Sequence, residues 1–227
     1  MRNKLLALVV VACAATAFLS TGCVRRTAPT AKAPVATDAA TSAVAFLGKT
    51  FVVAPFTIPT SDAELLSGYL PSGNHVPEVV PVHLDAALEQ DLAGSKQTIL
   101  PARLAAGCAR SAARGEESGR LATIRYWQNV GKCAGADFVV VPQVMDWTER
   151  DGSEVGATRP ASVDLSLTLL DTRTGALLKK YHFEETQQTL SANILEAQKF
   201  VSRNGRWLSA MELAQEGLKK GLAELGL

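Results

Sequence analysis

Apolar and polar residues along the chain follow a two-residue period in some segments, and these segments predict strands. Three short apolar runs rich in β-branched and aromatic residues are typical of buried strands: 50–56, 97–101 and 138–144. Pro142 places the end of the third run at a sheet edge or a bulge. Residues 162–170 alternate regularly, which predicts a strand with one core face and one solvated or lightly covered face. A glycine-containing turn at 171–175 predicts that 176–185 returns antiparallel.

Other segments follow the helical period. A capping box at Ser61 and Glu64 predicts a short helix that ends near Tyr69. Apolar residues spaced by three and four predict further helices: 82–92, 102–115, 117–134, 190–201 and 209–225. Gly135 is a natural left-handed stop for the helix before it.

The last helix carries the clearest signals. Ser209 and Glu212 form a second capping box at its start. Gly217 and Gly221 each cost about 1 kcal/mol of helix propensity against alanine, so we expect them to serve a close approach of this helix to the sheet. The order of elements predicts an α/β (α+β) domain over residues 48–227, with a mixed β-sheet of about five strands flanked by helices.

The N-terminus has a different character. Arg2 and Lys4 precede a run of roughly 15 apolar residues, 5–19, which is shorter than the ~20 that a membrane-spanning helix needs. A basic start, a short apolar core and small residues before a cleavage site are typical of a secretory signal peptide. The small residues 20–22 lead to Cys23, a pattern that resembles the lipobox of bacterial lipoproteins. We therefore expect residues 1–22 to be a lipoprotein signal peptide and Cys23 to carry lipid.

Two alternatives remain for this segment. Ser20 stands where the lipobox has an aliphatic residue, and residues 10–13, which end at Cys13, fit the motif better locally. Cleavage before Cys13, however, would leave an apolar core of only about seven residues, the lower limit for a signal peptide. The other alternative is a soluble secreted protein cut near Gly22, without lipid.

Residues 23–47 predict a flexible linker, because they are rich in Ala, Thr and Pro and lack apolar periodicity. By resemblance to enterobacterial sorting rules, Val24 in place of an aspartate favours the periplasmic face of the outer membrane over retention at the inner membrane. The whole chain carries 23 Lys and Arg against 22 Asp and Glu. This balance gives no basic stripe for a nucleic-acid partner.

Candidate chemistry is sparse. Cys108 and Cys133 predict either a disulfide in an oxidising compartment or two buried thiols. The sequence has no CxxC motif, and His75, His83 and His182 lack metal-ligand spacing, so we expect no metal and no cofactor. Motifs of serine hydrolases, zinc proteases and nucleotide-binding loops are also missing.

A few polar residues on the predicted hairpin form a candidate acid–base site. His182 and Glu184 share a strand face, and Asp164 lies across the hairpin from Glu184 or Glu185. Such groups can perform acid–base chemistry, but a solvated strand face explains them more simply. We therefore expect a protein that is not an enzyme.

Three segments carry a resemblance to a known family. They are Phe51–Phe56, Gly131–Gln143 and Val163–Gly175, which run FVVAPF, GKCAGADFVVVPQ and VDLSLTLLDTRTG. This series resembles the N-terminal domain of TolB and the periplasmic domains of CsgG-type and LpoB-type lipoproteins. The resemblance implies a TolB N-terminal-like fold. The regions 57–82 and 184–207 lack the long alternating runs of CsgG-type pores, so we expect no channel.

The sequence thus leaves three functions open. The first is a lipid-anchored periplasmic lipoprotein, not catalytic, that binds or scaffolds another cell-envelope protein in secretion, cell-wall or surface assembly. The second is a lipoprotein that binds a small molecule or glycan, which requires a concave pocket with a few convergent polar groups. The third, a hydrolase, requires titratable groups within hydrogen-bond reach of one another in such a pocket.

Overall fold

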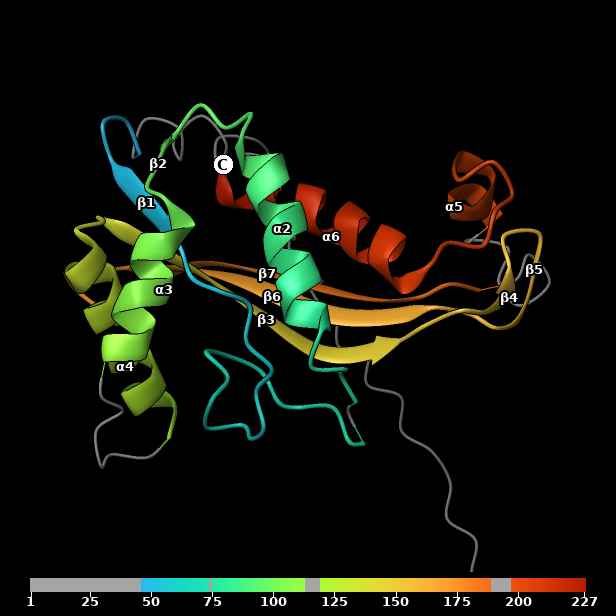
Figure 1. Ribbon diagram of the computed structural model, residues 1–227, viewed down its shortest axis with the longest axis horizontal. Helices are drawn as coiled ribbons and strands as arrows, with labels where there is room; N and C mark the ends of the chain where they lie inside the picture. The colour runs from blue at the N-terminus through green and yellow to red at the C-terminus, as the bar shows by residue number, and fades with distance from the viewer. Residues whose placement is uncertain (1–45, 74, 113–118, 189–196) are drawn as a thin grey trace, which may run out of the picture. The chain divides into compact units, whose positions relative to one another are not determined.

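A computed structural model describes residues 46–73, 75–112, 119–188 and 197–227 of the chain (Figure 1). A mixed sheet has the strand order β2–β1–β3–β6–β7, in which β2, β1 and β3 are parallel and β6 and β7 are antiparallel to their neighbours. The strands are β1 Thr50–Val53, β2 Thr98–Ile99, β3 Phe138–Thr148, β6 Ser162–Asp171 and β7 Leu177–Thr186. The predicted fold class, an α+β domain with a five-stranded mixed sheet, is confirmed.

Helices cover both faces of this sheet. Figure 1 shows α2 and α6 on one face and α3 and α4 on the other. The helices are α2 Val80–Leu92, α3 Ala102–Ser111, α4 Arg120–Ala134, α5 Ala197–Ser202 and α6 Ala210–Leu225. Of the helices predicted from the sequence, the segments 113–118 and 190–196 lie outside the described residues. Within the described part of the chain, no helix has both the length and the apolar character needed to cross a bilayer.

The β3–β6 connection contains a small hairpin that the sequence patterns did not predict. Strands β4 (Asp151–Ser153) and β5 (Gly156–Arg159) form this separate two-stranded sheet. Its residues are mostly exposed and polar, so they lack the alternation from which strands are read.

Phe46 extends the core to the start of the described chain. Its ring lies 5.3 Å from that of Phe51 and 5.2 Å from that of Phe138, both in edge-to-face geometry. Only 5% of its surface is exposed. The core therefore includes Phe46, a residue of the predicted linker 23–47 and not of the predicted domain 48–227.

Strand β6 is buried on both faces. Its alternation predicted one core face and one solvated or lightly covered face, and Asp164, Ser166 and Thr168 on that second face are buried together with the leucines on the other. Helices α2 and α6 cover the leucine face. On the opposite side, α4 and the segment after β1 pack over the sheet. The burial of these three residues agrees with the covered alternative and not with the solvated one. The sequence left both open because a pattern does not reveal what covers a polar strand face.

The short helix predicted from Ser61 and Glu64 was wrong, since these residues form turns. The Glu64 carboxylate accepts hydrogen bonds from the backbone N–H and the hydroxyl of Thr60, one position earlier than a capping box requires. The buried side chain of Gln143 donates to the carbonyl of Glu64 and accepts from the N–H of Leu66. These bonds from β3 satisfy backbone groups that a helix would have used.

Pro142 lies inside β3, next to the place where β1 ends. Its carbonyl accepts a hydrogen bond from the N–H of Thr57, in the segment that follows β1. The nitrogen and the carbonyl of a strand residue face the same neighbour, so the ring nitrogen of Pro142 also faces the side of β1, at a level beyond the last residue of that strand. The proline therefore removes no ladder bond on the β6 side. The bulge in β3 follows at Met145, between Val144 and Asp146.

Helix α6 approaches the sheet through its two glycines, as expected. A Cβ on Gly217 would lie 2.6 Å from Cδ1 of Phe183, and one on Gly221 would lie 2.6 Å from Cδ1 of Tyr181. We expect Gly217→Ala to lower the free energy of unfolding by about 1–3 kcal/mol through overpacking, although alanine is the better helix former. Urea denaturation measures this loss.

Gly107 in α3 provides a matched control for this prediction. A Cβ there would meet no atom within 4 Å, so Gly107→Ala should stabilise the protein by up to about 1 kcal/mol. Equal stabilisation by both substitutions would show that α6 does not need its close approach.

Candidate functional site

A groove opens where two parallel strands end. Its volume is about 630 Å³, and it lies among the residues that follow β1, the residues that follow β2, the exposed side of α2 and the first turn of α3. In open sheets with parallel strands, ligands bind beyond the carboxyl ends of the strands. The lining is mostly apolar and includes Val53, Val82, Leu88, Leu92 and Ile99.

Three charged residues also line the groove, and Asp85 on α2 is the most constrained of them. Its Oδ1 accepts a hydrogen bond of 2.8 Å from the backbone N–H of Phe56. Burial raises the pKa of Asp85, the bond from Phe56 opposes this rise, and Glu89 adds to it. The other two charged residues of the lining are Glu89 and Arg103. Two acidic residues and one basic residue therefore line the groove.

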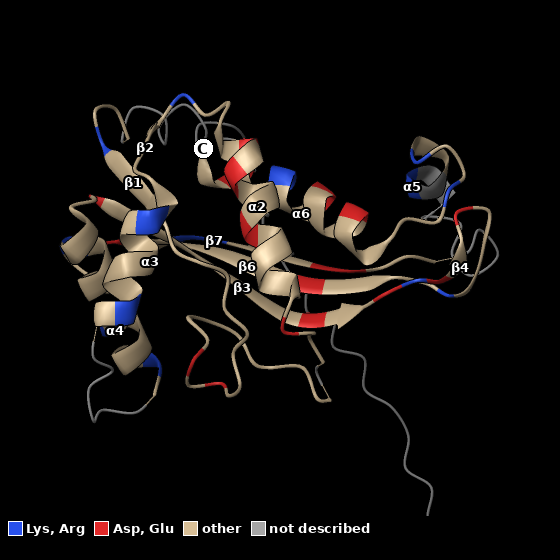
Figure 2. Ribbon diagram, in the orientation of Figure 1, with Lys and Arg blue, Asp and Glu red and all other residues tan. Residues whose placement is uncertain are grey.

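A second candidate site consists of acidic residues aligned across three neighbouring strands. Asp164 of β6 lies opposite Asp146 of β3 on one side and Glu184 of β7 on the other. Figure 2 shows acidic positions side by side on these strands. Residues directly opposite one another in a sheet point to the same face, so the three carboxylates share one face.

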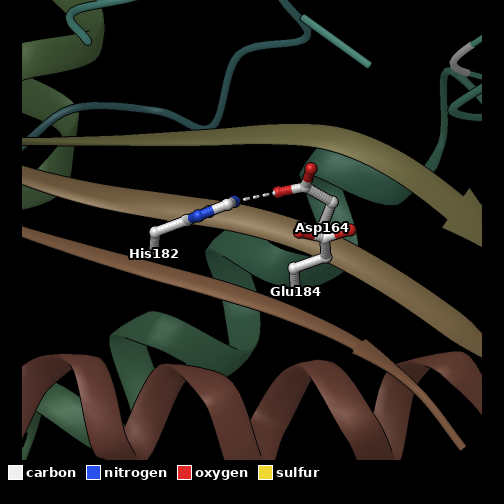
Figure 3. A group of neighbouring side chains, drawn as sticks. All are labelled: Asp164, His182 and Glu184. Atoms are coloured by element: carbon white, nitrogen blue, oxygen red, sulfur yellow. Dashed lines mark hydrogen bonds and ion pairs between the residues drawn. The ribbon is translucent and has the colours of Figure 1, made fainter. Parts of the chain in front are cut away.

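His182 completes this cluster. Its Nε2 lies 2.7 Å from Oδ1 of Asp164, and Glu184 points toward the same place (Figure 3). One ligand atom from each of Asp164, His182 and Glu184 lies within 4.8 Å of the others. Burial raises the pKa of Asp164, the hydrogen bond and charge of His182 lower it, and the charges of Glu184 and Asp146 raise it. Asp164 is buried, whereas His182 and Glu184 are exposed.

The cysteines of the body lie together. The structure joins Cys108 of α3 to Cys133 of α4 in a disulfide, with their Cα atoms 5.8 Å apart. Ala105 is the one fully buried residue of α3, so the bridge is a main attachment of this helix. Cys13 and Cys23 lie outside the described residues.

Sequence reasoning named most of these residues without their arrangement. It set His182 and Glu184 on one strand face and Asp164 across the hairpin, and the structure brings the three together. It missed Asp146, because the bulge at Met145 shifts the register of β3 and leaves no trace in the pattern. It also missed Asp85, which looks like an ordinary polar position on an amphipathic helix.

No family model matches the chain, and no curated protein matches it. Solved structures with some likeness include PelC from Paraburkholderia phytofirmans, with 12% identity and a TM-score of 0.42 over 79% of this chain and 88% of that one. Lipoprotein GNA1162 from Neisseria meningitidis has 12% identity and a TM-score of 0.38 over 69% of this chain and 98% of that one. LpoB from E. coli has 11% identity and a TM-score of 0.37 over 82% of this chain and 88% of that one. These values are too low to transfer a partner, an activity or a location to this chain.

Proposed function

We propose that this chain is a lipoprotein, anchored by acyl chains on Cys23 at the periplasmic face of the outer membrane, that binds another cell-envelope protein without catalysis. The observation that carries the proposal is the N-terminal pattern, a basic start, the short apolar run 5–19 and small residues before Cys23. Each buried CH₂ of a lipid contributes about 0.8 kcal/mol, so two or more chains give a stable anchor. Residues 24–45 then serve as the tether.

The disulfide between Cys108 and Cys133 supports the extracytoplasmic part of the proposal. Disulfides persist in oxidising compartments such as the bacterial periplasm, and the cytosol keeps most thiols reduced. The bridge attaches α3 to α4, and the first turn of α3 forms one wall of the groove.

The groove is the surface that we assign to the partner. Its apolar lining suits one or two apolar side chains, and Asp85 and Glu89 beside them favour a neighbouring Lys or Arg. We therefore propose that the occupant is a segment of an envelope protein that presents an apolar residue next to a basic one.

Changing the lipid attachment site tests the anchor. We expect Cys23→Ala to move the protein from the membrane fraction to the soluble periplasmic fraction and to abolish palmitate labelling, because Cys23 is the thiol that follows the whole apolar run 5–19. Cys13→Ala is the matched control and should leave both unchanged. An unacylated mature N-terminus in mass spectrometry, or an intact leader in the cytosol, would contradict the proposal.

Photocrosslinking from the groove tests the partner. A crosslinker at Val82, which is exposed and lines the groove, should capture a defined envelope protein in intact cells, and one at exposed Leu121 of α4 should not. Ala86→Arg, which fills the groove from the exposed side of α2, should abolish the Val82 product. A product that survives Ala86→Arg would argue against the groove as the docking surface.

The groove also favours a second function, binding of a small molecule or glycan. Its volume of about 630 Å³ lies within the range of roughly 300–1,000 Å³ found for ligand pockets. Native mass spectrometry of the purified protein distinguishes the two functions. If the protein retains a metabolite and Ala86→Arg abolishes that binding, the occupant of the groove is a small molecule and not an envelope protein.

A further inference from the structure

The row of carboxylates across β3, β6 and β7 is unusual because the sheet itself forces the charges together. Asp146 and Asp164 are register partners, and so are Asp164 and Glu184. Like charges directly opposite one another destabilise a sheet. Asp164, in the middle, is only 6% exposed, so water screens its charge poorly.

The positive charge that the protein supplies to this row is small. Among the described residues, His182 is the one ion-pair partner of the three carboxylates, and its charge depends on protonation. Lys180, two residues before His182 on the same strand, donates a hydrogen bond to the carbonyl oxygen of Ser67 and acts on Asp164 through its charge without forming an ion pair with it. Asp146 accepts a hydrogen bond from the backbone N–H of His75, which neutralises no charge. The row therefore favours an added cation.

We propose that Asp164, His182 and Glu184 bind a divalent transition-metal ion, with zinc as the best fit. One imidazole nitrogen and two carboxylate oxygens are ligands that zinc accepts, and the nitrogen disfavours calcium and magnesium. In a tetrahedral zinc site with bonds of about 2.0–2.2 Å, neighbouring ligand atoms are about 3.4 Å apart. Nε2 of His182 and Oδ1 of Asp164 lie closer than this, at 2.7 Å, so the ion would take the place of their hydrogen bond. The side chains of His182 and Glu184 are exposed and can move to admit it.

The arrangement also defines the character of the site. Three protein ligands leave the fourth position of a tetrahedral ion to water or to a group from another molecule. His182 and Glu184 are exposed, so this position faces solvent.

Metal titration of the full-length protein in detergent, after removal of metals with EDTA, tests the proposal. We expect saturable calorimetric binding of one Zn²⁺, and visible absorption typical of nitrogen and oxygen ligation when Co²⁺ is used as the probe. Removing a ligand should weaken binding at least as much as removing an outer-shell partner does, about 10–100-fold. His182→Gln, Glu184→Gln and Asp164→Asn should each show this loss.

Matched controls and a second ion make the test decisive. His83→Gln on α2 and Glu224→Gln on α6 remove the same side-chain types from exposed positions outside the cluster and should leave Zn²⁺ affinity unchanged. Glu184→Gln changes an exposed residue, so its result stands even where Asp164→Asn fails to fold. Equal affinity in ligand and control variants, or equal affinity for Ca²⁺ and Zn²⁺, would overturn the proposal.

Discussion

Replacing Arg203 with alanine is expected to lower the free energy of unfolding by about 3–5 kcal/mol, because it breaks a buried ion pair and leaves a carboxylate without its main partner. The guanidinium side chain of Arg203 is 6% exposed and that of Glu185 is 9% exposed. Nη2 of Arg203 lies 2.7 Å from Oε1 of Glu185 and 2.6 Å from Oε2 of Glu216. This arginine thus joins the segment after α5 to both β7 and α6.

The charge state of Arg203 follows from the same contacts. Burial by itself lowers the pKa of Arg203, but the hydrogen bonds and charges of Glu216 and Glu185 outweigh it and raise the pKa. Arg203→Lys keeps the charge without the planar fork that holds Glu216 at two points. We expect it to lie between the wild type and Arg203→Ala in stability.

Urea denaturation measures these differences, and Arg206 provides the control. Arg206 is 43% exposed and pairs with the exposed Glu154, so Arg206→Ala should cost less than about 1 kcal/mol. The double substitution Arg203→Leu, Glu185→Leu should recover a large part of the loss, since an apolar pair replaces a desolvated ionic one. Equal losses for Arg203→Ala and Arg206→Ala would contradict the structural role of Arg203.

Removing the disulfide is the second change with a large expected effect. The bridge closes a loop with a sequence separation of 25 residues, and a loop of this size stabilises the folded state by about 3 kcal/mol through the entropy of the unfolded chain. We expect the double substitution Cys108→Ser, Cys133→Ser to cost about this amount. Thermal unfolding with and without reductant measures it.

The loss should begin in α3. This helix buries little besides Ala105, and the hydroxyl of Tyr126 in α4 donates to the Ala109 carbonyl as a further attachment. Hydrogen exchange in residues 102–111 should therefore accelerate on reduction while α6, fully buried along one side, keeps its protection. Free Cys108 and Cys133 thiols in protein isolated without reductant would contradict the bridge itself.

Much of the fold could be predicted from the sequence because its signals are local. The capping box of α6 is formed by Ser209 and Glu212, three residues apart, and the structure contains both of its hydrogen bonds. Gly135 ends α4 at a φ of 72°, and Gly175, at 76°, lies in the turn between β6 and β7. Each of these features depends on residues within one or two turns of the chain, which is the range that periodicity and capping rules cover.

The candidate sites depended on contacts between residues distant in the sequence. The bulge at Met145 sets which residue of β3 faces Asp164. Gln143, nearly 80 residues further along the chain, binds the backbone of Glu64 and Leu66 and so disfavours a helix there. Helices α2 and α6 bury one face of β6, and α4 with the segment after β1 covers the other side of the sheet. The class of fold, the start and end of α6 and the expected N-terminal anchor could therefore be read from the sequence alone. The groove, the row of carboxylates and the pairing of Cys108 with Cys133 could not, because strand register and helix packing are set by partners that no local pattern contains.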